Sequence, residues 1–524
     1  MRSARATEPA DPGPVGGHDT TGASVLRGGA WLAVSQNLPQ LYTLALSVIA
    51  ARFLGPDQMG RQSFIAFAAL AVTLVLTSSL FVALMRYVGE TVGRGEPEAA
   101  RGLLLWAWKI EGALAAAALA VFVGIAVAGA TPQGAWALAG AVCALGVMHT
   151  VPTAVLVGLQ RFREASIAGL ITGALGIGAT AVVLAAGGGI TGMFAVEAVA
   201  GAANLVWTGL LARRRIELVA PRARTSPTLQ RLVARYALIS AIGVLLELVV
   251  TRRSEVFFLN RSSTDSEIAF YSIAFAAVTA FVQIPRSFAS ALSPAFATLH
   301  GAGARDRMRD GFWRGLRLLT LFTMPGLALS VALGPRLIEL VYGSEFSGAG
   351  TPLLIMLAAF PVIPAVSLCN ALLAGLARLR VPLMANAVAA VVDVGLAAML
   401  VPRLDAVGAA IANTSGALVY GGIVGVNAGR LVVPVDLDLR SLVEGAAAAG
   451  LAAAAGWAVV AQVDGFAGLC AAGAAVVVLY LAGARALRII PHRDEQWLEG
   501  ALGRRFGPAV GRACKPFTAA PRDA

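Results

Sequence analysis

The chain has 524 residues, of which 58% are hydrophobic and only 13% are charged. Its net charge is +12 at pH 7 and its mean hydropathy is +0.76. Soluble domains carry about a quarter charged residues, so this composition excludes an ordinary soluble enzyme. Apolar runs long enough to cross about 30 Å of hydrocarbon recur along most of the chain, and in lipid such runs must be helical.

The spacing of these runs predicts an all-α polytopic membrane protein of about 14 transmembrane helices, with two parallel six-helix lobes plus two C-terminal helices. The first residues are rich in Pro, Gly, Asp and Thr and lack the pattern of a cleaved signal peptide. We divide the chain into a disordered cytoplasmic tail (1–26), an N-lobe (27–212), a basic cytoplasmic linker (213–235), a C-lobe (236–430), two further spans (431–490) and a basic cytoplasmic tail (491–524).

Basic residues fall mainly in alternate gaps between the predicted spans. Of the 41 Lys and Arg residues, only seven fall in the gaps assigned to the outer side when the N-terminus is placed inside. Cytoplasmic loops retain basic residues, so this asymmetry predicts a multi-pass protein of the plasma (inner) membrane with both termini in the cytoplasm. The same placement argues against nucleic-acid binding, despite a pI near 10.4.

Two short segments are repeated at an offset of a little over 200 residues. The sequence IAFAA occurs at 65–69 and at 273–277, and GLQRFR at 158–163 is followed by the similar GLARLR at 375–380. The second pair occupies the same cytoplasmic loop of each six-helix unit. Repeated units in the same orientation predict two parallel lobes with substrate bound between them, as in alternating-access transporters.

Polar side chains share one face on three predicted spans, where burial in lipid would be costly and a cavity is the usual explanation. The first span, 28–52, carries Gln36, Gln40, Thr43 and Ser47. The seventh, 236–259, carries Tyr236, Ser240, Glu247, Thr251 and Ser254. The eighth, 267–297, carries Ser272, Thr279, Gln283, Arg286, Ser290 and Ser293.

Arg286 has two interpretations. It either reaches the interface or pairs with an internal acid, or it binds an anion in a water-filled cavity, because guanidinium suits phosphate recognition. Glu247 is either the partner of Arg286 or a proton-coupled carboxylate. Arg252 and Arg253, near the outer end of the seventh span, are further cavity candidates, although Arg252 is spaced to pair with Glu255.

Two other spans carry charged residues. Lys109 is either a second cation or an interfacial residue, since it cannot face Glu111 two positions later. Asp393, one heptad after Asn386, gives the eleventh span a weaker polar face.

Nothing in the sequence predicts catalysis, a cofactor or a metal site. The four histidines lie mostly in tails and loops, and the four cysteines show no CxxC spacing. None of the 58 glycines belongs to a phosphate loop that ends in Lys-Ser or Lys-Thr. We therefore expect a transporter rather than an enzyme.

Several loops resemble those of Wzx-type polysaccharide flippases. The segment ARFLGPDQMG (51–60) resembles that family's RxLGPxxxG loop, and GLQRFR (158–163) resembles its GxxRF loop. Three more matches follow in order: AFYSIA (269–274), YGSEF (342–346), and VPR (401–403) with GAAIA (408–412). The sequence RRSE (252–255) departs from that family's commoner pattern, which is a single acid at this place.

The resemblance implies the multidrug/oligosaccharidyl-lipid/polysaccharide (MOP) exporter fold. It also implies a cationic inward-facing cavity that receives an undecaprenyl-pyrophosphate oligosaccharide for cell-surface polysaccharide biosynthesis. Membrane lipids, and a polysaccharide polymerase or other assembly proteins, would be its partners. We expect the first, second, seventh and eighth spans to line the cavity and Arg286 to hold the phosphate. The alternatives are a cation-coupled multidrug antiporter of the same fold and a non-transporting scaffold of a polysaccharide assembly complex.

Overall fold

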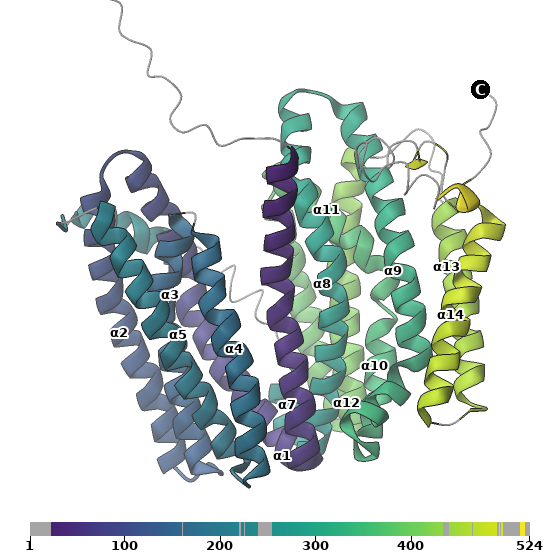
Figure 1. The fold of residues 1–524 in the computed structure, drawn as a ribbon, viewed down its shortest axis with the longest axis horizontal. Helices are drawn as coiled ribbons and strands as arrows, with labels where there is room; N and C mark the ends of the chain where they lie inside the picture. Colours follow the sequence, from purple (N-terminus) through teal and green to yellow (C-terminus); the bar gives the residue numbers. More distant parts are fainter. Residues whose placement is uncertain are drawn as a thin grey trace, which may run out of the picture.

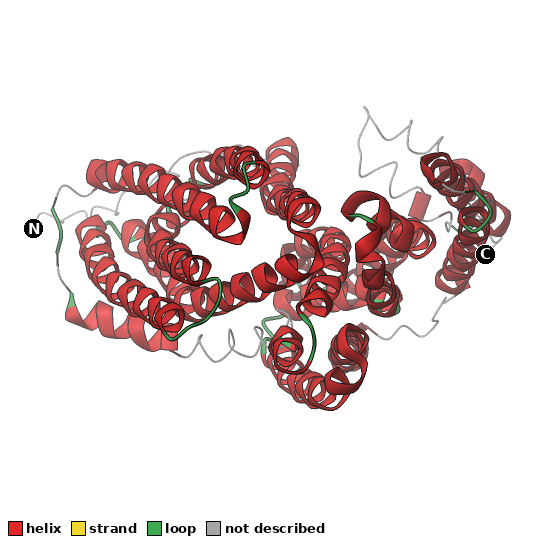
Figure 2. Cartoon of the chain, turned by 90° about the horizontal axis from the view of Figure 1, so that it is seen from below, coloured by secondary structure: helices red, strands yellow, loops and turns green. Residues whose placement is uncertain are grey.

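A computed structural model describes residues 22–518 except 160, 220–221, 225, 239–253, 433–439, 464, 490–491, 493 and 496–513. Within these ranges, side chains are described from residue 41 onward, except at 79, 162, 218–219, 291 and 440–442. Figure 2, seen roughly along the helix axes, shows this part of the chain as helices joined by short loops. The prediction of an all-α membrane protein is confirmed.

The first group of helices lies between residues 22 and 219. Its elements are α1 (Gly22–Gly93), α2 (Pro97–Val127), α3 (Gln133–Gly158), α4 (Phe162–Ala185) and α5 (Gly189–Val219). Helix α1 begins inside the predicted tail and covers both the first and the second predicted spans. Its axis breaks at Gly55, whose φ of 69° is open to glycine at little cost.

The second group begins after the gap at 239–253. Its elements are α7 (Glu255–Ser262), α8 (Asp265–Gly301), α9 (Arg305–Tyr342), η1 (Ser344–Ala349), α10 (Gly350–Leu357), η2 (Phe360–Val362), α11 (Ile363–Gly375), α12 (Arg380–Val432), α13 (Arg440–Val460), α14 (Gly465–Leu487) and η3 (Lys515–Phe517). Helix α12 breaks at Asp405. Residues 227–238 form one further helical segment ahead of the gap.

The predicted count of fourteen spans is not confirmed. The described residues contain 10 helices long and apolar enough to cross a membrane, or 11 if the bent pair Ser344–Leu357 and Phe360–Gly375 is one span. Two of these, Leu41–Gly93 and Arg380–Val432, have 53 residues each. At 1.5 Å per residue each is about 80 Å long, enough for two crossings. The predicted seventh span falls largely outside the described residues.

Figure 1 shows how the helices are arranged. Helices α2 to α5 form one group and α8 to α12 the other, with α1 between them and alongside α8. We call these groups the N-lobe, which includes α1, and the C-lobe, which includes α7. Helices α13 and α14 pack against α9 at the far edge. Much of the buried core is alanine, which lets helices approach closely in a membrane.

The lobes meet at the end that the topology prediction places outside. Ala51 and Met59, beside the break in α1, belong to the same buried cluster as the C-lobe core. Arg61 forms an ion pair with Asp265 at 2.5 Å, and Ser47 lies 2.8 Å from the hydroxyl of Tyr342. These contacts tie the two lobes together at this end.

Backbone also approaches backbone there. A Cβ atom added to Gly60 would lie 1.7 Å from the carbonyl oxygen of Asp265. No side chain larger than hydrogen fits between the lobes at this point. Nearby, Arg52 Nε donates a hydrogen bond of 2.7 Å to the carbonyl of Val341.

The C-terminal segment is anchored to α9. Asp494, with 1% of its side chain exposed, accepts hydrogen bonds from Arg314 at 3.0 Å and from Arg317 at 2.7 Å. Within the membrane region, the Tyr480 hydroxyl of α14 donates to the carbonyl of Leu321 at 3.0 Å. The added helix pair is therefore held to the C-lobe at two levels.

Candidate functional site

The C-lobe contains a cavity of about 790 Å³ between α8, α10–α11 and α12, which we call the C-lobe cavity. One face of α8 contributes polar residues at successive spacings of four and three, which keeps them in line: Thr279, Gln283, Arg286, Ser290 and Ser293. The facing helices contribute Ser367, Asn370, Asn386, Asn413, Thr414 and Tyr420. The lining is thus rich in hydroxyl and amide groups.

Arg286 is the one cation among the described residues that line this cavity. Its side chain is exposed to the cavity, and Gln283 and Ser290 lie on the same helix face. Across the cavity, the Tyr420 hydroxyl donates a hydrogen bond of 2.8 Å to Asn370 Oδ1 and so fixes the orientation of that amide. A guanidinium surrounded by fixed neutral polar groups can bind an anionic group and the hydroxyls next to it.

Two buried acids lie behind the cavity. Glu255 of α7 and Asp393 of α12 are 0% and 1% exposed. Asn413 Nδ2 donates to Glu255 Oε1 at 2.8 Å, and Ser254 Oγ donates to Asp393 Oδ2 at 3.2 Å. The two carboxyl groups lie close enough to interact with each other, and the Tyr271 hydroxyl also lies within reach of Glu255.

Burying two neighbouring carboxylates away from water while both are ionised would cost many kcal/mol. The pair must therefore bind a proton or a small cation. Asn413 both lines the cavity and binds Glu255. It therefore connects the acid pair to the C-lobe cavity. The described residues contain no group of three or more His, Cys, Asp and Glu side chains placed to bind a metal ion.

The N-lobe has a cavity of its own, of about 370 Å³, formed by α1, α3, α4 and α5 and called here the N-lobe cavity. Its polar lining includes Thr43, His149, Glu197 and Asn204. None of the described residues lines both cavities. Each lobe therefore encloses a polar space, one with an arginine and the other with an acid.

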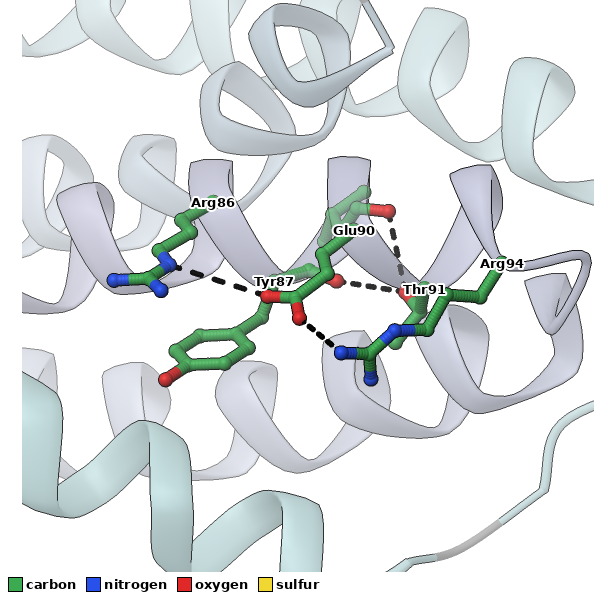
Figure 3. Close-up of polar contacts among 6 residues, drawn as sticks. Arg86, Tyr87, Glu90, Thr91 and Arg94 are labelled. Atoms are coloured by element: carbon green, nitrogen blue, oxygen red, sulfur yellow. Dashed lines mark hydrogen bonds and ion pairs between the residues drawn. The ribbon is translucent and has the colours of Figure 1, made fainter.

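A third polar cluster lies at the C-terminal end of α1, where Figure 3 shows one acid between two arginines. Glu90 is 3.9 Å from Arg86 and also pairs with Arg94. The guanidinium carbon of Arg86 lies 5.4 Å from the ring centre of Tyr87 and 5.2 Å from that of Tyr236. These cation–π contacts hold the helical segment 227–238 against the N-lobe.

The predicted site residues are divided between these places. Gln283 and Arg286 line the C-lobe cavity, and Thr43 lines the N-lobe cavity. Lys109 is exposed on the side of α2 opposite the buried Glu111 and lines neither cavity. The remaining predictions lie outside the described side chains: Gln36, Gln40, Glu247, Arg252 and Arg253.

Sequence reasoning missed several residues of the two cavities: Asn370, Asn413 and Tyr420 in the C-lobe, and His149, Glu197 and Asn204 in the N-lobe. None of them belongs to a polar stripe like the one that marked α8. The internal repeat was the available signal, because it pairs the fourth and sixth predicted spans with the tenth and twelfth. Those four spans carry all six residues.

Comparison with known proteins gives a family match and a fold. Residues 133–350 match the family model described as polysaccharide biosynthesis protein. The structure is similar to that of the lipid II flippase MurJ in an inward closed conformation, with a TM-score of 0.67 at 11% identity, covering 87% of this chain and 98% of that one. No curated protein sequence matches the chain.

Two further solved structures share the fold. One is an inward-facing MATE family multidrug resistance transporter of the MOP superfamily, with a TM-score of 0.58 at 15% identity, covering 75% of this chain and 94% of that one. The other is a MOP superfamily transporter from Pyrococcus furiosus, with a TM-score of 0.54 at 15% identity, covering 78% and 96%. The shared fold is the one that the loop resemblance implied, and the family match extends over residues 133–350.

Proposed function

We infer that the chain is a MOP-superfamily flippase of polysaccharide biosynthesis, and we propose that it moves an undecaprenyl-pyrophosphate-linked oligosaccharide across the plasma membrane. The observation that carries this proposal is the C-lobe cavity, in which a single described arginine stands among amides and hydroxyls. Arg286 would bind the phosphate, since a guanidinium forms strong paired bonds with phosphate oxygens. The neutral polar groups around Arg286 would contact the remaining oxygens of the pyrophosphate.

Alternating access would carry the substrate across. The contacts between the lobes at the predicted outer end support a state closed to the outside, with Arg61 and Asp265 among the residues that must separate. Substrate would enter from the cytoplasm, where both termini are proposed to lie. Rocking of the lobes would then break the outer contacts and release the glycan outside.

The experiment measures flipping of a fluorescent lipid-linked oligosaccharide in vesicles reconstituted with the full chain. Arg286→Ala should abolish flipping, and Arg286→Lys should retain only part of it because lysine lacks the bidentate fork. Arg94→Ala provides the matched control, since Arg94 is 65% exposed and lies outside the cavity. If the Arg286→Ala variant flipped the lipid-linked oligosaccharide at the wild-type rate, the proposed phosphate-binding role of Arg286 would be rejected.

A cation-coupled multidrug antiporter of the same fold is the second candidate. The buried pair of Glu255 and Asp393 favours it, because such a pair can load and release a proton or cation during transport. This function predicts cation-dependent dye efflux that Asp393→Asn abolishes. Dye efflux without flipping would support the antiporter, whereas flipping that depends on a cation gradient would make the acids the coupling site of the flippase.

A further inference from the structure

The N-lobe cavity is kept open by the composition of α4. The face of α4 that lies toward α1 and α5 carries glycines at 169, 173 and 176 and therefore has no side chains at these positions. A Cβ atom at Gly173 would lie 2.9 Å from the ring of Tyr42, and one at Gly169 would lie 3.9 Å from Asn204. Because glycine has no side chain, the ring of Tyr42 can pack directly against α4 without a side chain of α4 filling the cavity beside it.

The polar groups of this cavity are mainly hydrogen-bond acceptors. Glu197 has an exposed carboxylate in the lining and no hydrogen bond to a described residue, and Asn204 Oδ1 is buried without a partner. Thr43 and Thr172 add hydroxyls, and His149 adds a ring nitrogen. The described lining contains no Lys or Arg. With no Lys or Arg to attract phosphate, this cavity suits a neutral ligand that offers hydrogen-bond donors.

Size narrows the class of ligand. At about 370 Å³ the N-lobe cavity is near the lower end of the roughly 300–1,000 Å³ typical of small-molecule sites. A proton or a metal ion would need no such volume, and an oligosaccharide would not fit. A single sugar ring fits, with its hydroxyl or amino groups toward Glu197 and Asn204 and one face toward Tyr42.

We propose that the N-lobe cavity binds one sugar residue of the lipid-linked substrate through that residue's hydroxyl or amino groups. This inference rests on the proposed flippase function and assigns the two ends of the polar head to different lobes. The phosphate binds at Arg286 in the C-lobe, and the sugar binds at Glu197 and Asn204 in the N-lobe. When one lobe moves relative to the other, a substrate bound to both would gain or lose contacts.

The experiment compares two probes that differ only in the sugar. One is geranylgeranyl pyrophosphate, and the other is the same lipid carrying one N-acetylglucosamine. Binding to the full chain is measured in lipid nanodiscs, because sugar-based detergents would compete for the site. The wild type should bind the sugar-bearing probe about tenfold more tightly or better, as expected when several new hydrogen bonds include one to a charged group.

Three variants separate the two subsites. Glu197→Gln should weaken the sugar-bearing probe about tenfold and leave the bare pyrophosphate unchanged. Arg286→Ala should weaken both probes by the same factor. Glu111→Gln, a buried acid of the same lobe outside the cavity lining, is the control and should change neither.

The proposal is overturned if Glu197→Gln weakens both probes equally or changes neither. Should that variant fail to fold, Gly173→Ala narrows the cavity against the ring of Tyr42 and should reduce the advantage of the sugar-bearing probe in the same way. The underlying function is tested separately. If the wild type binds the two probes with different affinities but flips neither, the proposed flippase function is refuted, whereas the proposed sugar site is retained.

Discussion

Gly60→Ala tests whether the observed state depends on contact between the lobes at the end that the topology prediction places outside. The added Cβ would lie 1.7 Å from the carbonyl oxygen of Asp265, and real Cβ atoms essentially never approach heavy atoms closer than 3.0 Å. The two segments must therefore separate by about 1.3 Å, the difference between these distances. Overpacking of this kind costs about 1–3 kcal/mol. If the open state escapes that cost, its population rises about 5- to 150-fold relative to the closed state.

The separation can be measured between spin labels at exposed positions on the two sides of the contact, Gln58 and Thr264. Cys470 and Cys514 are first replaced by serine so that labelling is confined to these positions. Gly93→Ala is the matched control, because a Cβ atom at Gly93 meets nothing within 4 Å. A Gly60→Ala protein with the distance distribution of the wild type would refute the assigned packing.

Three further changes have expected outcomes. Asp494→Ala removes a buried acid bound by two arginines and should lower stability by about 3 kcal/mol in thermal unfolding, whereas Asp306→Ala, at a 95% exposed position, should cost less than about 1 kcal/mol. Tyr420→Phe removes the hydrogen bond that orients the amide of Asn370 and should weaken pyrophosphate binding about fivefold. Unchanged binding would show that this hydrogen bond plays no part in shaping the cavity. Asp393→Asn should remove the dependence of flipping on a sodium or proton gradient, and an unaltered dependence would exclude the acid pair from coupling.

Much of the fold follows from local rules that a sequence displays. The polar stripe of α8 depends only on helix periodicity, and five of its six residues, Thr279 to Ser293, do line one cavity. The breaks in α1 and α12 occur where loops separate predicted spans, because Gly55 and Asp405 take backbone conformations that interrupt a helix. Hydrophobic length and period therefore predict the elements and their faces.

The composition of the cavities depends on contacts between distant helices, which local patterns do not encode. Thr43 shares a stripe with Ser47, yet Thr43 lines the N-lobe cavity and Ser47 contacts Tyr342 of the other lobe. Glu255, which the spacing predicts to pair locally with Arg252, accepts a hydrogen bond from Asn413, 158 residues away. Arg252 itself lies outside the described residues, so its pairing stays a prediction.

The contact between Asp494 and α9 has a consequence for how the protein is made. Arg317 and Asp494 are 177 residues apart in the chain. At about 5–20 residues per second, roughly 9 to 35 s separate their synthesis. Helix α9 must therefore enter the membrane before residue 494 has been made, and the C-terminal segment docks on it only afterwards. A chain that stops before residue 494 lacks this contact, so its α9 is not anchored by the C-terminal segment.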